Sequence, residues 1–211
     1  IAPDELRRIH NVVQERGGIT LIDEIYLGLS YEEQFGHTAL AIDDNIISIN
    51  SFSKYFNMTG WRLGWMVVPE ALVPVVERLA QNLFICASTI SQHAALACFE
   101  DESIAEYERR RAEFKARRDY FIPELQRLGL SVPVLPDGAF YAWADCSNAC
   151  AKLGVEGSWD FAFELMRRAH LAVTPGRDFG HFDPQRFVRF STANSMAQLQ
   201  EAVARLQRLL G

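Results

Sequence analysis

The first half of the chain alternates amphipathic stretches with short, continuous apolar runs. Residues 3–16 carry apolar side chains at helical spacing, begin with a proline and end before a pair of glycines, which predicts a helix. Residues 19–23 and 46–50 are short apolar runs, a pattern typical of buried parallel strands. The segment between them, residues 24–45, is long enough for the crossover that two parallel strands require.

A third apolar run, residues 63–68, follows the second too closely for another helical crossover. Only residues 52–60 separate the two runs, so the third strand is expected to lie antiparallel to the second. This length argument places Lys54 and Arg62 at the same end of an α/β sheet. Open α/β sheets bind ligands beyond the carboxyl ends of their strands, so a functional site is expected there.

The second half of the chain opens with the longest helical pattern, residues 103–128, which Pro123 is expected to kink. We place the domain boundary along this helix, with residues 1–105 in a large domain and residues 106–211 in a linking helix and small domain.

The other predicted elements are helices at 69–82, 88–100 and 160–170, the last capped by Ser158. Strands are predicted at 132–135, 139–144 and 187–191, and a final helix starts with the capping box Ser195–Gln198.

Composition excludes several classes of protein. The net charge is −6, and the arginines between residues 109 and 118 are interleaved with glutamates, which argues against a nucleic-acid partner. No run of 18 apolar residues occurs, which argues against a membrane-spanning helix. The four cysteines form no C-x-x-C pair, so we expect buried free thiols in a cytoplasmic protein and no metal site.

The segment from Asn50 to Gly64 carries the strongest candidate chemistry. Lys54 lies at the mouth of a predicted strand, with Ser51 and Ser53 before it and Arg62 after it. A lysine amine can condense with an aldehyde, while hydroxyls and a guanidinium hold a nearby phosphate. Pyridoxal phosphate has both groups. The alternative is a surface lysine in an ordinary strand–loop–strand segment.

Two short motifs in this segment resemble a known family. SFSK at residues 51–54, followed by MTGWRLG at residues 58–64, is similar to the Schiff-base segment of class I/II aminotransferases, which belong to the fold-type I pyridoxal-phosphate superfamily. The resemblance implies a mostly parallel sheet with helices on both faces, a small α+β carboxy-terminal domain and a homodimer. It also implies transfer of an amino group between an L-amino acid and a 2-oxo acid.

The resemblance covers only the later half of a family member, and the first residue is Ile1. We therefore expect this chain to be a carboxy-terminal fragment that is incomplete and inactive by itself. Two other functions stay open. One is a different fold-type I enzyme, such as a C–S lyase or a synthase. The other is an aminotransferase-like sensor domain that binds the cofactor without turnover.

The resemblance also implies roles for individual residues. Asp23 is expected to pair with the pyridine nitrogen of the cofactor and Tyr26 to reach its phenolic oxygen. Without the resemblance, Asp23 reads equally well as a helix cap and Tyr26 as a packed ring. Lys54 is expected to carry the cofactor and to move the proton during catalysis. The phosphate-binding residues implied are Ser51, Ser53 and Arg62.

Arg189 is the candidate for substrate binding. Its guanidinium lies between apolar neighbours in a predicted strand, which is costly without an anionic partner. The resemblance implies that it binds the substrate's α-carboxylate, whereas an edge-strand arginine that points to water is the alternative. Arg177 is a weaker candidate, and the rings of Phe140 and Tyr141 are expected in the core rather than the site.

Overall fold

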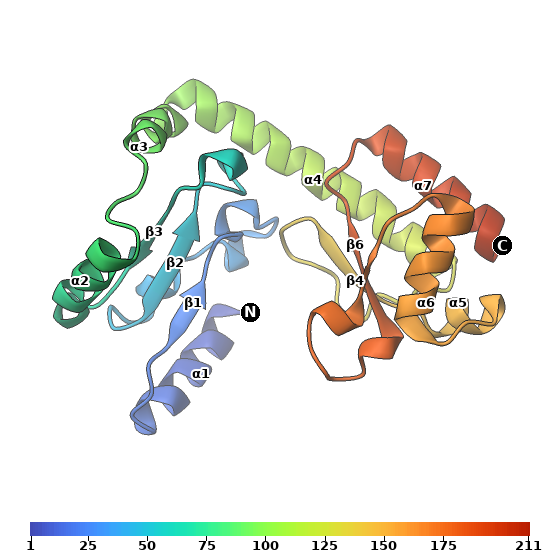
Figure 1. Ribbon diagram of the computed structural model, residues 1–211, viewed down its shortest axis with the longest axis horizontal. Helices are drawn as coiled ribbons and strands as arrows, with labels where there is room; N and C mark the ends of the chain where they lie inside the picture. The colour runs from blue at the N-terminus through green and yellow to red at the C-terminus, as the bar shows by residue number, and fades with distance from the viewer. The chain divides into compact units, whose positions relative to one another are not determined.

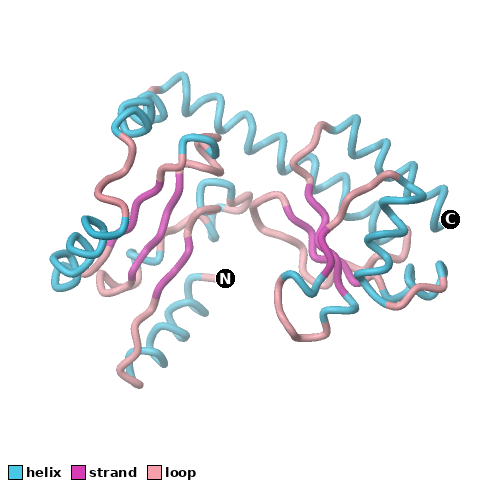
Figure 2. The backbone as a smooth tube through the Cα atoms, in the orientation of Figure 1, coloured by secondary structure: helices cyan, strands magenta, loops and turns pink.

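The computed structural model describes all residues, 1–211, and has the predicted α/β class (Figures 1 and 2). The chain divides into two compact units, Ile1–Ala112 and Glu113–Gly211. The division falls within helix α4, Asp101–Arg127, and the expected boundary after residue 105 falls in the same helix. None of the helices combines the length and the apolar character needed to cross a lipid bilayer.

The first unit is built on a sheet of three strands in the order β1-β2-β3. Strand β1 (Leu21–Asp23) lies parallel to β2 (Ile47–Ser51), and β3 (Gly64–Val67) lies antiparallel to β2, as the connection lengths predicted. The carboxyl ends of β1 and β2 meet at one end of the sheet, and the β2–β3 connection begins there. The helices of this unit besides α4 are α1 (Pro3–Glu15), α2 (Val73–Leu83) and α3 (Thr89–Leu96).

The expectation that residues 19–23 form a buried strand is wrong in one respect. Strand β1 is parallel, but Leu21 is 54% exposed, and all four residues of β3 are exposed. The reason is that β1 and β3 are the two edges of the sheet, so neither has a strand on its outer side. Helix α2 likewise has no buried residue, and it begins at Val73 after a 3₁₀ turn rather than at residue 69.

A buried histidine joins α1 to the start of β1. His10 is 1% exposed, and its Nδ1 lies 2.8 Å from Thr20 Oγ1. Its Nε2 lies 3.3 Å from a carboxylate oxygen of Asp43, in the segment before β2. Both ring nitrogens therefore have partners, as a buried polar side chain requires. This contact positions α1 beside the sheet, and the apolar pattern of α1 did not predict it.

The second unit has an antiparallel sheet in the order β4-β6-β5. Its strands are β4 (Tyr141–Asp145), β5 (Thr174–Pro175) and β6 (Phe187–Ser191). Side chains alternate along β4 and β6, so that one face is buried and the other carries Trp143 and Arg189. Helices α5 (Ser147–Leu153), α6 (Gly157–Glu164) and α7 (Met196–Leu210) complete this unit. Its core comprises Phe121, Leu125, Leu130, Ala142, Ala144, Phe161, Leu165, Val188, Leu199 and Leu206, among others.

Several predicted elements of this unit need correction. Residues 132–135 form no strand, because prolines at 133 and 136 have no N–H to donate, and only Ser131 pairs with Asp145. Helix α6 begins at Gly157, so Ser158 lies inside it, and its hydroxyl donates to the Pro184 carbonyl at 2.7 Å. Helix α5 was not predicted. The turn Leu165–Ala169 lies in the helix predicted at 160–170, but its π-helical form was not predicted. The capping box at Ser195–Gln198 is confirmed.

The last residue of β4 carries a carboxylate that stabilises the start of β6. Burial alone would raise the pKa of Asp145, but hydrogen bonds from Ser147 and Arg186 outweigh it and lower the pKa below its usual value. The Ser147 amide donates at 2.9 Å and Arg186 Nε donates at 3.2 Å. A carboxyl group with a lowered folded-state pKa stabilises the fold above about pH 4, and this stabilisation is lost as the pH falls through the folded-state pKa.

Asp145→Asn should therefore lower the free energy of unfolding at pH 7 by about 1–2 kcal/mol, since it removes charge-assisted hydrogen bonds. The difference from the wild type should shrink as the pH falls below about 4, because the wild-type carboxylate is then protonated as well. Urea unfolding followed by circular dichroism between pH 7 and 2.5 measures this. A difference that stays constant over the whole range would contradict the role given to Asp145.

Candidate active site

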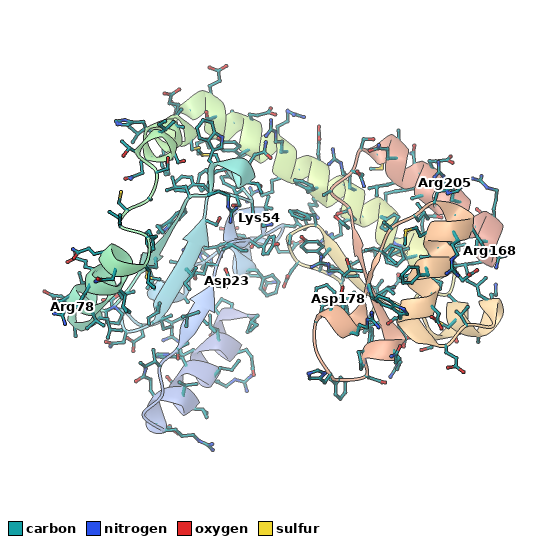
Figure 3. The ribbon with its side chains drawn as sticks, in the orientation of Figure 1. Asp23, Lys54, Arg78, Arg168, Asp178 and Arg205 are labelled. Carbon is teal, nitrogen blue, oxygen red and sulfur yellow. The ribbon has the colours of Figure 1, made fainter.

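The carboxyl ends of β1 and β2 bring together three of the predicted site residues. Asp23 is the last residue of β1, and Lys54 follows β2 (Figure 3). Tyr26 lies in the turn after β1. The ammonium nitrogen of Lys54 lies 5.5 Å from the centre of the Tyr26 ring. Asp23 Oδ1 accepts a hydrogen bond from the Ile25 amide at 3.1 Å, and its other carboxylate oxygen has no partner in the chain. Asp23 is exposed, so that oxygen is available to a ligand.

A buried carboxylate supports the turn that carries Asp23 and Tyr26. Glu24 accepts hydrogen bonds from the hydroxyls of Thr38 and Ser48, at 2.9 and 2.6 Å, and from the Ala39 amide at 2.5 Å. Three donors compensate a carboxylate that is almost completely removed from water. The network links the turn after β1 to β2, so it holds Asp23 and Tyr26 on either side of Glu24. The sequence showed only a glutamate beside Asp23, which is not enough to predict this role.

The β2–β3 connection gathers hydroxyls and a cation. The Ser53 amide donates to Ser51 Oγ at 3.0 Å, and the Thr59 hydroxyl donates to the Ser53 carbonyl at 2.7 Å. Arg62 donates to the Thr59 carbonyl at 3.0 Å and makes no ion pair within the chain. Its φ is +52°, in the left-handed region that non-glycine residues seldom adopt and that is enriched at functional sites. The connection therefore holds an exposed guanidinium without a carboxylate partner.

The residue after Lys54 is held by its own contacts. The Tyr55 hydroxyl donates a hydrogen bond to Glu108 of α4 at 2.6 Å. Burial makes the largest contribution to raising the pKa of Tyr55 above its usual value, and this hydrogen bond makes the next largest. Arg111 forms an ion pair with Glu108. The Tyr55 ring packs directly over Gly28, where an added Cβ would lie 2.6 Å from the ring. These contacts fix the backbone on the carboxyl side of Lys54.

Gly28→Ala should destabilise the first unit by about 1–3 kcal/mol, because the methyl group has no space beside the Tyr55 ring. The matched control is Gly60→Ala, in the β2–β3 connection, because a Cβ there would meet no atom within 4 Å. Urea unfolding of the two variants and the wild type measures the difference. Equal unfolding midpoints for Gly28→Ala and Gly60→Ala would contradict the close packing of Gly28 and Tyr55.

In the second unit, Arg189 lies against two aromatic rings. Its guanidinium carbon lies 4.1 Å from the centre of the Tyr141 ring and 4.5 Å from that of Phe179. The side chain is half-buried and has no hydrogen bond or ion pair within the chain. Tyr141 therefore contacts the candidate site, although its apolar surroundings in the sequence favoured the core. Arg177 stacks instead on Trp159 of α6, 2.9 Å from the ring centre.

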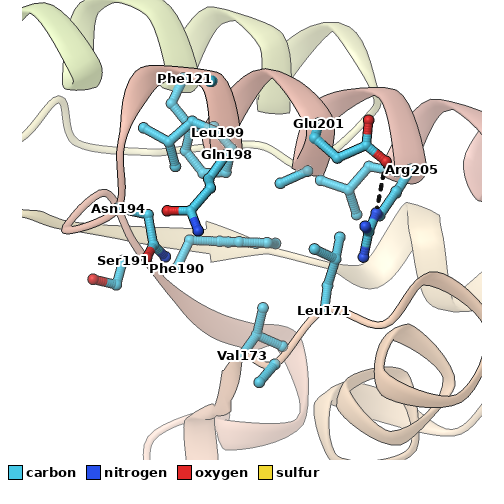
Figure 4. A pocket seen from close by; sticks show the side chains of 14 residues that line it. Phe121, Leu171, Val173, Phe190, Ser191, Asn194, Gln198, Leu199, Glu201 and Arg205 are labelled. Carbon is cyan, nitrogen blue, oxygen red and sulfur yellow. Dashed lines mark hydrogen bonds and ion pairs between the residues drawn. The ribbon is translucent and has the colours of Figure 1, made fainter.

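The other face of this sheet has a cavity that contains none of the predicted site residues. It has a volume of about 450 Å³ and lies between α7 and the segment 171–173 (Figure 4). Phe190 and Leu199 form part of its apolar wall, and the ion pair between Glu201 and Arg205, at 2.9 Å, lies at its edge. Because Phe190 and Arg189 alternate along β6, this cavity and Arg189 lie on opposite faces of the sheet.

Comparison with known proteins gives one consistent result. The family described as "Aminotransferase class I and II" matches residues 1–206. Valine–pyruvate aminotransferase of Mycobacterium tuberculosis is 35% identical over 207 residues, which are 98% of this chain and 52% of that protein. Aspartate aminotransferase of Sulfurisphaera tokodaii is 31% identical over 99% of this chain and 52% of its own length.

Solved structures agree with this result. The crystal structure of an aminotransferase from Mycobacterium tuberculosis superposes with a TM-score of 0.91 at 35% identity, over 100% of this chain and 53% of the other. The aromatic aminotransferase from Pyrococcus horikoshii gives a TM-score of 0.90 at 30% identity, over 100% and 56%. The chain thus spans about half the length of the relatives that it matches. Because the family match extends over nearly all of its residues, the chain belongs to the class I and II aminotransferases.

Proposed function

We propose that the protein containing this chain is a pyridoxal-phosphate-dependent aminotransferase that moves an amino group between an L-amino acid and a 2-oxo acid. The observation that carries the proposal is the position of Lys54. Lys54 follows the carboxyl end of β2 and lies beside Tyr26. Ser51 precedes it at the end of β2, and Ser53 and Arg62, which makes no ion pair within the chain, lie in the same β2–β3 connection. Membership of the family supports the same reaction class.

The residues at this end of the sheet fit the groups of pyridoxal phosphate. When bound, the cofactor supplies an aldehyde and a ring that withdraws electrons from the substrate's α-carbon. Lys54 would hold the cofactor through a bond between its amine and the aldehyde carbon. The carboxylate oxygen of Asp23 that has no partner in the chain would keep a proton on the ring nitrogen, and the Tyr26 hydroxyl would donate to the phenolic oxygen. Ser51, Ser53 and Arg62 would hold the phosphate.

Lys54 has a second task once its amine is released. Its neutral amine would accept the proton from the substrate's α-carbon as a general base and would deliver it to the cofactor's aldehyde carbon as a general acid. Arg189 is the proposed receptor for the substrate's α-carboxylate, because its half-buried guanidinium has donors but no anionic partner in the chain. Binding energy at the carboxylate thereby orients the amine for reaction.

We also propose that the protein is a cytoplasmic homodimer. The four cysteines are free thiols, which fits a reducing compartment. Cys98, Cys146 and Cys150 are buried, but the expectation of burial is wrong for Cys86, which is exposed. The end of α2 and the residues directly after it support an association, because Leu83, Phe84 and Ile85 are 77%, 61% and 78% exposed. Light scattering of the complete protein measures its oligomeric state, and a monomer at micromolar concentration would contradict the dimer.

The test of the reaction is a single half-reaction of the complete protein loaded with pyridoxal phosphate. Addition of an L-amino acid without a 2-oxo acid should convert the cofactor to pyridoxamine phosphate and release one equivalent of 2-oxo acid, both measured by mass spectrometry. Release of ammonia or carbon dioxide instead would indicate a lyase or a decarboxylating enzyme. A cofactor that stays unchanged with all amino acids would indicate a sensor domain. Either result would reject the proposal.

A further inference from the structure

We propose that Tyr141 and Phe179 are positioning residues for Arg189, whose guanidinium they hold between their rings so that only its N–H edge can receive a carboxylate. This inference rests on the role proposed above for Arg189. It assigns a task to two aromatic residues that the family resemblance had not included in the site. We call these two residues and Arg189 the aromatic clamp.

The topology of the sheet places the two rings on different sides of Arg189. Strand β6 is the central strand, with β4 on one side and β5 on the other. Tyr141 comes from β4, and Phe179 follows the 3₁₀ turn Gly176–Asp178 that comes directly after β5. Both ring centres lie within 4.5 Å of the guanidinium carbon, yet the two rings make no contact with each other. The guanidinium therefore lies between them.

Further rings restrain the clamp. Trp143, which pairs with Arg189 across β4 and β6, meets the Phe179 ring edge-on at 5.3 Å. The same indole stacks on Phe187 at 5.5 Å with an interplanar angle of 16°. Phe140 contacts the Tyr141 ring at 4.7 Å. Because each clamp ring also packs against another aromatic ring, the separation of the two clamp rings is set before any ligand arrives.

The clamp changes what Arg189 can bind and how tightly. A guanidinium covered on its faces can still donate hydrogen bonds in its own plane, which is the geometry that a carboxylate accepts with two oxygens. The rings also attract the cation and restrict its rotation, so less side-chain freedom is lost when an anion binds. Removal of one ring should therefore weaken carboxylate binding while the positive charge stays.

The experiment uses the chain labelled with ¹⁵N and follows the Arg189 Nε–Hε signal by NMR, with pyruvate as the probe. The signal is assigned by its disappearance in Arg189→Lys. In the wild type, ring currents should displace it from the positions of exposed arginines. In Phe179→Leu and Tyr141→Leu, it should move back towards those positions, and the affinity for pyruvate should fall about five- to tenfold, in line with the strength of a partly desolvated cation–π contact.

Two controls separate positioning from a general structural effect. Phe182→Leu changes a phenylalanine of the same loop that is 92% exposed and does not contact Arg189, so it should leave both readouts unchanged. Tyr141→Phe keeps the ring and loses only the hydroxyl, so it should bind pyruvate with the wild-type affinity, in contrast to Tyr141→Leu. The NMR signals of the α7 backbone amides should keep their wild-type positions in every variant, because that helix belongs to the core and not to the clamp.

The outcomes distinguish this inference from the proposed function. Pyruvate affinity that is unchanged in both Phe179→Leu and Tyr141→Leu overturns the clamp alone. So does a loss in Phe182→Leu or Tyr141→Phe as large as that in the leucine variants of the clamp. If the wild-type Arg189 signal does not respond to pyruvate, or Arg189→Lys binds pyruvate as tightly, then Arg189 is not the carboxylate receptor. The clamp and the role proposed for Arg189 then both fail, whereas the reaction class is decided separately by the half-reaction.

Discussion

Lys54→Ala is expected to abolish covalent capture of pyridoxal phosphate by this chain. The wild-type chain, incubated with the cofactor and reduced with borohydride, should gain the mass of one reduced cofactor, because reduction makes the carbon–nitrogen bond permanent. The modified lysine can be identified directly, because the chain has only three lysines, Lys54, Lys115 and Lys152. Intact mass followed by peptide mapping identifies which lysine carries the adduct.

The other two lysines provide the control. Lys115 pairs with Asp119 on the surface of α4, and Lys152 donates to the carbonyl of Leu210. Neither lies at the end of β2, so Lys115→Ala should gain the adduct as the wild type does. The proposal for Lys54 fails if Lys54→Ala is modified to the wild-type extent, or if the wild-type adduct maps to the peptide of Lys115 or Lys152.

Arg189→Ala is expected to weaken the binding of amino acids to the complete protein on the order of 100-fold, which corresponds to about 3 kcal/mol for the loss of a two-pronged, charge-assisted contact. The cofactor should be retained as in the wild type, because the residues proposed to hold it belong to the first unit and Arg189 to the second. The rate of the half-reaction at increasing L-alanine concentrations measures the first quantity, and cofactor absorbance after dialysis measures the second.

Arg177→Ala is the matched variant for this experiment. Arg177 is an exposed arginine near Arg189 in the sequence, but its guanidinium stacks on Trp159. Its removal should change amino-acid binding less than tenfold. If Arg189→Ala loses the cofactor and the amino acid to the same degree, or if Arg177→Ala has the larger effect, then Arg189 is not the carboxylate receptor.

The part of the fold that positions Lys54 could be predicted from the sequence, because it depends on residues that are close together in the chain. The short connection from β2 to β3 allows only an antiparallel pair, and the ladder from Ser48 with Val67 to Ser51 with Gly64 confirms it. The capping box of α7 depends on two residues three positions apart, so it too could be read from the sequence. In both cases the deciding interaction is close in the chain.

Interactions between distant residues account for what the sequence did not predict. Glu24 is satisfied by Thr38, Ala39 and Ser48, which only the folded sheet brings around it. Tyr141 was predicted to be a core residue because its strand is apolar. Its contact with Arg189 depends on the register of β4 against β6, which the sequence does not show. A periodic pattern assigns a side chain to a face, but it does not identify the residue that it will meet there.

The two open edges of the β1-β2-β3 sheet also determine how this chain behaves in concentrated solution. The outward N–H and C=O groups of β1 and β3 are not paired with another strand, and extended segments of neighbouring molecules can dock on them. Such docking would shield exposed Leu21, Trp65 and Met66 from water in the same event. Aggregation of the chain should therefore begin at the exposed edges of this sheet.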